Sequence, residues 1–573
     1  MSTGTSTITS TATDVDRLDG LLGDPWDAGN PTGFAALLEA DEREEMHAES
    51  ERVLDGYGLN AEFVPVGLGG RLAQVDRLVQ VMRAVWRRDP CLGLGYGASS
   101  FIASVNVWSA GDERQRREVA DLLLANRKVA SAYHELAHGN DFSRAEFAAV
   151  RDGTGWRLDG RKEVVTNLRR ADALVVFART RPDPGSRSHA QFLVPKAGIP
   201  EGALRYLPRF PSSGMRGVQL GGAVFNGCPV PGDALLGDEP GRGIETALSS
   251  FQLTRSALPS MCVGVVDTGL RAALASALDR RLYGGAAADL PYVRAVIGRA
   301  QADLLAADAF ATVVTRALHV LPEETGVSAP AVKYLVSRLL IDAMDELRTV
   351  LGARAYLRDG PFGVFQKLAR DLAPAGFAHV SRAACQVTIL PQLPRLARRA
   401  WFEGGPAPAG LFRLGGDLPP LDFGALRPGA PRSDGLSGTL VETAETCSDG
   451  VVGRFAARFR DELDRLRRDC AALGPRDLTI DARPEAYALA GRYTVVLAAA
   501  ACLGVGRHGR DGLGDLDERW LPAALDRLDR RLGGPPVLTE PERRDLEEAM
   551  FRLARERHDG RRLLDLTGRA VRG

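Results

Sequence analysis

The sequence predicts a mostly α-helical protein with a β domain in its middle, which places it in the α+β class. Between residues 41 and 126, leucine, valine and alanine recur three and four positions apart, the spacing that puts apolar side chains on one face of a helix. From residue 128 to about residue 238 the pattern changes to short apolar runs that glycine, proline and aspartate separate, as in strands joined by turns. Helical spacing returns at residue 243, so the order along the chain is helical, β, helical.

Changes of pattern divide the 573 residues into six segments. The first is rich in serine and threonine and lacks the basic and apolar regions of a signal peptide, so we expect a disordered or extended tail. A later stretch dense in glycine and proline indicates a linker. The segments are a tail (1–30), an N-terminal helical domain (31–127), a middle β domain (128–238), a helical bundle (239–402), the linker (403–438) and an additional helical domain (439–573).

Charge and cysteine content exclude several classes of protein. Basic and acidic residues number 73 each, so no overall field attracts the chain to nucleic acid or to an anionic membrane. The seven cysteines are far apart and none has the spacing of a metal site, so we expect reduced core thiols and no metal. The longest run of small apolar residues, 493–503, is too short to span a bilayer. We therefore expect a cytoplasmic protein that binds neither nucleic acid nor membrane.

One motif has the spacing of a nucleotide-binding fingerprint in surroundings that do not suit it. Residues 504–509 read G-V-G-R-H-G, and Asp526 follows downstream. However, the alanine-rich run before the motif favours a helix over a strand, and no βαβ pattern follows. We interpret these glycines as part of a helix.

A series of short motifs occurs in one order between residues 132 and 371. Each is brief, and their common order makes chance agreement implausible. The motifs are A-Y-H-E-L-A-H-G-N-D (132–141), W-R-L-D-G-R-K-E-V-V-T-N (156–167), F-P-S-S-G-M-R-G (210–217), V-P-G-D-A-L-L-G (230–237), Q-L-T-R (252–255), L-D-R-R-L-Y-G (278–284), L-G-A-R-A-Y (351–356) and L-A-R-D (368–371).

These motifs resemble, in sequence and in order, those of the acyl-CoA dehydrogenases. The first is similar to that family's flavin-contacting segment, which usually ends T-E-P-x-A-G-S-D, and the second to its W-x-x-x-G-x-K-x-W-I-T-N. The resemblance covers about residues 30–400 and implies a helical domain, a β-barrel-like middle domain and a four-helix bundle, here followed by an additional helical domain. It also implies FAD as the cofactor and oxidation of an acyl thioester, in which the flavin takes a hydride while a carboxylate removes the α-proton.

The resemblance also assigns site residues by position. Arg255 would lie near the substrate thioester, and Ser381 near the pyrophosphate of FAD. Because part of the cofactor would reach a neighbouring subunit, a homodimer or homotetramer is implied. The flavin and its ribityl chain would contact Tyr133, His134, Asn140 and Thr166, and the FAD of the neighbouring subunit would contact Arg280, Tyr283, Thr349 and Gly352.

The catalytic carboxylate of the family is missing from this chain. The family places a glutamate eight residues after the aspartate of the R-D motif, and His379 occupies that position, followed by Val380 in place of glycine. Some relatives carry the glutamate just before the arginine of the earlier helix, where this chain has Thr254. A neutral imidazole accepts protons near pH 7, so His379 is a candidate base; a histidine that only lines the pocket is the alternative. Val164 replaces the tryptophan that usually shields the flavin, which either opens that face or reflects simple repacking.

Three functions remain open at this point. The leading hypothesis is an FAD-dependent dehydrogenase of an acyl thioester, carried on CoA or on an acyl carrier protein, in a specialised biosynthetic pathway. An electron-transfer flavoprotein or oxygen would accept the electrons. The second hypothesis keeps the fold and FAD but makes the protein a flavin-dependent monooxygenase or oxidase. The third is a scaffold without flavin chemistry.

Overall fold

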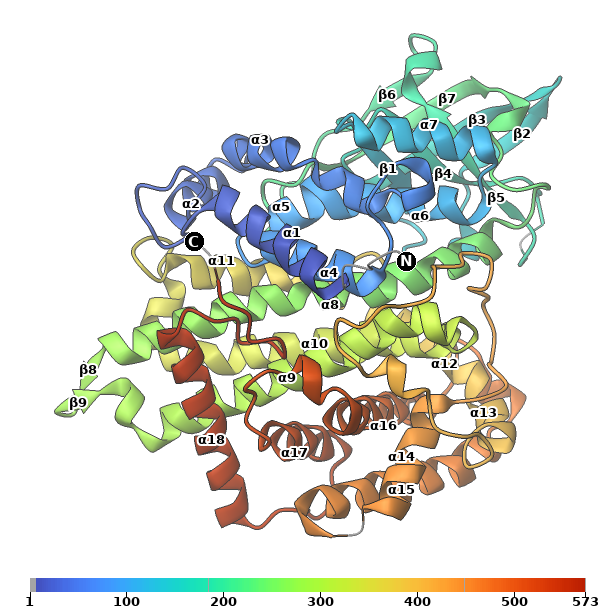
Figure 1. Ribbon diagram of the computed structural model, residues 1–573. Helices are drawn as coiled ribbons and strands as arrows, with labels where there is room; N and C mark the ends of the chain where they lie inside the picture. The colour runs from blue at the N-terminus through green and yellow to red at the C-terminus, as the bar shows by residue number, and fades with distance from the viewer. Residues whose placement is uncertain (1–6, 184, 448, 572–573) are drawn as a thin grey trace, which may run out of the picture.

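A computed structural model describes residues 7–183, 185–447 and 449–571 (Figure 1). It confirms the predicted α+β class: helices, then a β domain, then helices to the end of the chain. The N-terminal helices pack against both the β domain and the long helices that follow it (Figure 1). They are α1 (Thr7–Leu22), α2 (Phe34–Glu42), α3 (Ala48–Tyr57), α4 (Val75–Trp86), α5 (Pro90–Leu92), α6 (Ser99–Ala110) and α7 (Glu113–Leu124).

The predicted disordered or extended tail is wrong for most of its length, because Thr7–Leu22 form helix α1. Val15, Leu18 and Leu22 recur at helical spacing on one buried face of this helix. Asp19, which is 1% exposed, accepts a hydrogen bond from Arg87 of α4 at 2.8 Å. The sequence analysis missed this helix because the apolar stripe is short and lies among serines and threonines. The partners that stabilise the helix also lie far away in sequence. Residues 1–6 of the expected tail lie outside the described residues.

The middle domain is a seven-stranded mixed sheet in the order β1-β4-β2-β3-β7-β6, with β5 paired to β4. β1 and β4 run parallel, whereas β3 pairs antiparallel with both β2 and β7. β4 is buried at every position except its last, as expected for a central strand. The strands are β1 (Val129–Ala132), β2 (Ala148–Asp152), β3 (Gly155–Thr166), β4 (Ala173–Arg179), β5 (His189–Pro195), β6 (Leu204–Tyr206) and β7 (Leu220–Val230).

The helical bundle is built on α8, which spans 37 residues, or about 55 Å. α9 and α10 pack along α8, and α4 of the N-terminal domain covers another side of it. A small hairpin that the sequence does not predict, β8 (Arg281–Leu282) with β9 (Gly285–Ala286), joins α8 to α9. The helices are α8 (Gly243–Asp279), α9 (Pro291–Val320), α10 (Thr325–Leu351), α11 (Gly363–Leu372), α12 (Arg382–Ile389) and α13 (Leu393–Arg399).

Residues 403–438 cross the bundle and pack onto it. Phe412 in this stretch is fully buried, and Arg316 of α9 donates to the carbonyl of Leu411 at 3.0 Å. Gly504 lies in helix α16, so the glycine motif is helical as expected, and it gives the Phe412 ring room to approach the backbone. The additional helices are α14 (Gly435–Thr446), α15 (Gly450–Ala471), α16 (Pro484–His508), α17 (Trp520–Leu532) and α18 (Glu540–Asp559).

Among the described residues, two helices, α8 and α16, are long and apolar enough to cross a membrane by length and composition alone. α9 and the residues after it pass the same test only as a pair bent by 120°. The run at 493–503 therefore belongs to a longer apolar helix than we expected. Most of the apolar stretch of α8 and of α16, 83% and 78%, is buried against the rest of the chain. All seven cysteines are free thiols.

Candidate active site

A buried ion pair shapes the predicted flavin-contacting segment. Lys162 of β3 donates to Glu135 Oε1 at 2.8 Å and to the Tyr133 carbonyl at 2.9 Å. Glu135 also accepts from the backbone N–H groups of Glu146 and Phe147, at 2.8 and 3.1 Å. Burial lowers the pKa of Lys162 to about 8, and burial also opposes the charge on Glu135, but Lys162 still holds the Glu135 pKa below its ordinary value. The two motifs that carry these residues are thus joined by one buried charge pair.

Aromatic side chains connect this segment to helix α8. The ring of Phe142 lies 5.4 Å from His134 and 5.8 Å from Phe251 of α8, measured between centroids. Tyr133 is buried beside them and donates its hydroxyl to Asn106 Oδ1 at 2.8 Å. Burial and the nearby Lys162 lower the pKa of His134 to about 4, although a hydrogen bond with Asn140 opposes the shift. His134 is therefore neutral at physiological pH.

His379 and Thr254, the residues at the two positions to which the motif resemblance assigns a catalytic glutamate, are in direct contact. Thr254 Oγ1 lies 2.6 Å from His379 Nε2. The edge of the Phe251 ring meets the imidazole with 5.1 Å between centroids. His379 has a backbone φ of +61°, a left-handed conformation that costs energy for a residue with a side chain. The fold thus holds this histidine in a strained conformation against α8.

Arg255 and Lys333 put two buried cations beside His379. Arg255 is 4% exposed; its Nη1 lies 3.4 Å from Thr388 Oγ1, and its buried Nε has no partner. Lys333 of α10 is 3% exposed and donates to the Ala375 carbonyl at 2.7 Å. Within the described part of the chain, neither cation is within ion-pair distance of a carboxylate. Burial, then Lys333, His134 and Arg255, lower the pKa of His379 well below its ordinary value, so this imidazole is neutral at pH 7.

Lys333 was missed by sequence reasoning. The chain contains only five lysines among its many arginines, and Lys333 interrupts an apolar helical run. A rare lysine in an apolar run was the sequence signal that could have identified it. The structure places it among Arg255, Cys262 and Cys385. Burial raises the pKa of both thiols, so they remain protonated and do not neutralise the cations.

The other predicted cofactor residues divide between two places. Thr166 ends β3, two residues after Val164, which forms a bridge with His134. Ser381 caps the N-terminus of α12 by accepting from Ala384 N at 3.2 Å, two residues after His379. Both are half-buried and belong to the part of the fold that carries His134 and His379.

The remaining four predicted residues lie at the far end of the bundle. Arg280 Nη1 donates to the Leu351 carbonyl at 3.4 Å, beside Gly352 with its φ of +58°. Tyr283 is 94% exposed on the β8–β9 hairpin, and Thr349 is exposed at the end of α10. Arg280 follows Arg255 by 25 residues along α8, or about 37 Å. Figure 1 shows the hairpin and the β domain at opposite ends of the molecule, so one chain does not bring the two groups together.

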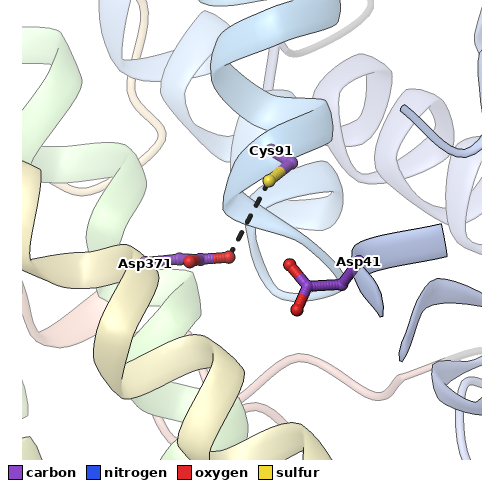
Figure 2. A group of neighbouring side chains, drawn as sticks. All are labelled: Asp41, Cys91 and Asp371. Atoms are coloured by element: carbon purple, nitrogen blue, oxygen red, sulfur yellow. Dashed lines mark hydrogen bonds between the residues drawn. The ribbon is translucent and has the colours of Figure 1, made fainter. Parts of the chain in front are cut away.

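The R-D motif, Arg370 and Asp371, belongs to a network of buried charged side chains that precedes His379 along the chain. Figure 2 shows Asp41, Cys91 and Asp371 turned toward one another, with Cys91 Sγ 3.8 Å from Asp371 Oδ2. Three such groups could hold a metal ion, but Lys367 already supplies a positive charge there, donating to Asp371 at 2.8 Å and to Asp89 at 2.5 Å.

Asp371 also fixes the loop that precedes β7, because it accepts from the backbone N–H of Met215 at 2.6 Å and from Arg370 Nε at 2.9 Å. Arg370 in turn donates to Asp41 at 2.6 Å. The network ties α2, α11 and the β domain together a few residues before His379, so it fixes where the histidine segment begins.

Comparisons with known proteins agree with this arrangement. Residues 241–376 match the family described as acyl-CoA dehydrogenase, C-terminal domain. The probable acyl-CoA dehydrogenase FadE25 of Mycobacterium tuberculosis (strain ATCC 25618 / H37Rv) is 28% identical over 336 residues, which are 58% of this chain and 84% of that protein. The match to the family ends at Gly376, immediately before the segment that carries His379.

Solved structures share the fold. Butyryl-CoA dehydrogenase from Megasphaera elsdenii superposes with a TM-score of 0.59 at 18% identity, covering 68% of this chain and 98% of that one. The prolyl acyl carrier protein oxidase AnaB superposes with the same score and identity, covering 67% of this chain and 98% of its own. About a third of this chain lies outside each of these superpositions.

Proposed function

We propose that this chain, a relative of the acyl-CoA dehydrogenases and an FAD-dependent oxidoreductase of their type, oxidises an acyl thioester at its α,β bond with His379 as the proton acceptor. The observation that carries the proposal is the contact between His379 and Thr254, which brings the two positions of the family's base together beside Arg255. In the reaction the substrate would lose a proton from its α-carbon and a hydride from its β-carbon, and a carbon–carbon double bond would form.

The residues around His379 suit a flavin. Segment 133–141 is held in one conformation by the Glu135–Lys162 pair, and the buried Nε of Arg255 is a donor that lacks a partner within the described residues. Tyr133, His134, Asn140 and Thr166 would hold the isoalloxazine and ribityl chain, with Ser381 closer to the pyrophosphate. FAD, when bound, supplies the acceptor for the hydride.

His379 is free to take a proton because it is neutral at pH 7, although its lowered pKa makes it a weaker base than an ordinary imidazole. If Thr254 donates its hydroxyl hydrogen to Nε2, the proton of the imidazole lies on Nδ1; in the other tautomer Nε2–H donates to Thr254 and Nδ1 is free to accept. Only the second tautomer leaves a basic nitrogen for the substrate. Arg255 and Lys333 would stabilise negative charge that develops on the thioester.

The protein would act as a homodimer or homotetramer. Arg280 is half-buried, and Tyr283, Thr349 and Gly352 are exposed, on one surface that the same chain's flavin-contacting residues do not approach. A second copy could present this surface to the ADP part of FAD. Gel filtration with and without FAD tests the proposal, since a cofactor-retaining monomer would exclude it.

The acyl carrier is either CoA or an acyl carrier protein, and an electron-transfer flavoprotein or oxygen takes the electrons. The structural likeness to AnaB, whose name is prolyl acyl carrier protein oxidase, supports an acyl carrier protein as one of the two candidate carriers. The loss of the glutamate supports a specialised biosynthetic role over general fatty-acid degradation.

Anaerobic stopped-flow spectroscopy tests the function directly. FAD-loaded protein mixed with a panel of saturated acyl-CoA and acyl-pantetheine thioesters should lose its flavin absorbance near 450 nm. His379→Ala should slow this bleaching at least a hundredfold, whereas His379→Glu, which puts a carboxylate at the same position, should retain more of the rate. Bleaching at the full rate in His379→Ala would make His379 a lining residue only.

A second candidate function is a flavin-dependent monooxygenase or oxidase, which the low pKa of His379 favours because a weakly basic imidazole removes an α-proton poorly. Val164 lies where relatives carry the shielding tryptophan and is only half-buried. Under this alternative no acyl thioester bleaches the flavin without oxygen, and an external reductant is needed before oxygen-dependent product appears.

A further inference from the structure

A cavity of about 340 Å³ lies away from His379, at the junction of the N-terminal domain, the bundle and the C-terminal tail. Its lining comes from the loop after α1, the ends of α2 and α4, the middle of α8, the loop before α11 and residues 558–571. Asp267 and Thr268 of its lining follow Arg255 by 12 and 13 residues along α8, or about 18 to 20 Å. The cavity is therefore separate from the candidate active site.

Among the charges that line the cavity, one buried cation, Arg88, has no direct ion pair within the described residues. Arg87 pairs with Asp19 at 2.8 Å, and Arg271 pairs with Asp267 at 2.8 Å. Arg88, which is 4% exposed, donates only to the backbone carbonyls of Leu22 and Gly23.

Burial lowers the pKa of Arg88 to about 10, although Asp19 and Asp24 oppose the shift, so its guanidinium remains charged at pH 7. Among the described residues no carboxylate lies within ion-pair distance of it. A buried charge of this kind is costly unless an anion compensates it, and a guanidinium binds a carboxylate through two parallel hydrogen bonds.

Apolar side chains form part of the wall around Arg88, and charged side chains of both signs line the rest of the cavity. Trp26 meets the Phe34 ring edge-on with 4.7 Å between centroids, and Pro361 and Phe362 also line the cavity. Trp26 is 42% exposed, so it is a large apolar side chain at the rim with little covering it. A volume of this size falls in the range of small-molecule sites, where apolar walls surround a few polar anchors.

The C-terminal tail forms the remaining wall, through Leu563 and Val571. Hydrogen bonds from Leu564 N to Asp267 and from Leu566 N to Asp308, at 2.5 and 2.9 Å, hold the tail against the bundle. Val571 lines the cavity together with Phe34 at the start of α2 and Phe362 just before α11. The cavity is therefore completed by residues well beyond the part that matches the family.

We propose that this cavity is a second binding site, for a small organic monoanion with an aromatic or branched apolar body. Its carboxylate pairs with Arg88, and its apolar body lies between Trp26 and Phe362. The ligand is distinct from the acyl thioester, and its binding requires neither FAD nor turnover.

Isothermal titration of the full chain with phenylacetate, in the presence of saturating FAD, tests the proposal. Phenylacetate should bind with one site per chain, and phenylacetamide, which has the same shape without the charge, should bind at least tenfold more weakly. Arg88→Met and Trp26→Ala should each weaken phenylacetate binding at least tenfold. Arg555→Gln, an exposed change on α18 outside the cavity, should leave it unchanged.

Three results would overturn the proposal: no binding of phenylacetate, equal binding of the amide, or competition between phenylacetate and FAD, which would assign the cavity to the cofactor. Because Arg88 also holds the end of α1, circular dichroism must show that Arg88→Met is folded. If that variant does not fold, Trp26→Ala and the amide comparison still decide the outcome.

Discussion

Thr254 and His379 are separated by 125 residues and meet through a 2.6 Å hydrogen bond. One lies within α8 and the other in the loop between α11 and α12. Each occupies a position to which the motif resemblance assigns a glutamate, and a hydroxyl–imidazole pair stands there in this chain. The hydroxyl can orient the ring and select its tautomer, as partners of catalytic histidines commonly do.

Thr254→Val removes the hydroxyl while it keeps the volume of the side chain. We expect the rate of flavin reduction by an acyl thioester to fall about fivefold to tenfold, because one net hydrogen bond is worth about 1 kcal/mol. Substrate binding should change little, since Thr254 acts through His379. Thr254→Ser is the matched control and should keep most of the rate; equal rates in the wild type and in Thr254→Val would remove the positioning role.

The pH dependence of flavin reduction reports the protonation of His379. Its pKa is lowered, so the imidazole is neutral through the physiological range, and activity is lost only as pH falls through that lowered pKa. The acid limb of the profile should therefore lie below pH 6.5. Lys333→Met removes one of the cations that depress the pKa and should move this limb to higher pH, whereas Lys333→Arg should not. If the acid limb lies at the same pH in the wild type, Lys333→Met and Lys333→Arg, the limb does not report the protonation of His379.

Acid stability should depend on His134. Its pKa is about 4 in the folded chain and about 6.5 when unfolded, so the unfolded state binds the extra proton and stability is lost as pH falls from 6.5 toward 4. The loss from this residue is roughly 3 kcal/mol at most. Urea unfolding at pH 7 and pH 5 measures it. His134→Gln should lose less stability between these pH values than the wild type, and a parallel loss would refute the prediction.

Lys162→Met should destabilise the β domain strongly. It leaves Glu135 buried without its cation, a change that typically costs about 3–5 kcal/mol. The double variant Glu135→Gln/Lys162→Met should recover part of that stability, because it no longer buries a lone charge. Urea unfolding measures both, and retention of FAD through gel filtration reports whether segment 133–141 keeps its shape. Additive losses in the double variant would mean that the two charges do not interact.

Gly504→Ala tests how residues 403–438 pack. A Cβ at this position would lie 2.2 Å from the Phe412 ring, so we expect a loss of about 1–3 kcal/mol from overpacking. Gly20→Ala is the control, since its Cβ meets nothing within 4 Å in helix α1 and should stabilise slightly. Thermal unfolding measures both variants. An unchanged melting temperature in Gly504→Ala would show that the crossing segment moves freely.

The sequence predicted the α+β class and chain order because helical and strand spacing are local properties of these segments. It also identified Thr254, His379 and the R-D pair as separate positions. The contacts that these residues make could not be predicted from the sequence, because the partners are distant along the chain. Asp371 contacts Cys91 from 280 residues away, and Arg370 contacts Asp41 from 329 residues away. Local periodicity carries no information about such pairs.

Helix α1 and Lys333 were missed for a related reason. The stripe of Val15, Leu18 and Leu22 is short, and threonines and serines around it suggest a solvated tail. The helix is stable because Arg77 and Arg87 of α4 pair with its aspartates. Lys333 looks like any single charge in a helix until the fold surrounds it with Arg255 and two thiols.

The tail that closes the cavity also bonds to the first helix of the chain. Arg569 donates to Asp19 at 2.8 Å across 550 residues of sequence. On the ribosome, Arg569 is made 550 residues after Asp19, so α1 cannot complete its native contacts until that late part of the chain has been synthesised. Closing so long a loop is slow, and loss of residues 562–571 would remove this partner from α1. Helix α1 and residues 562–571 therefore fold cooperatively, and proteolysis within either segment would weaken both.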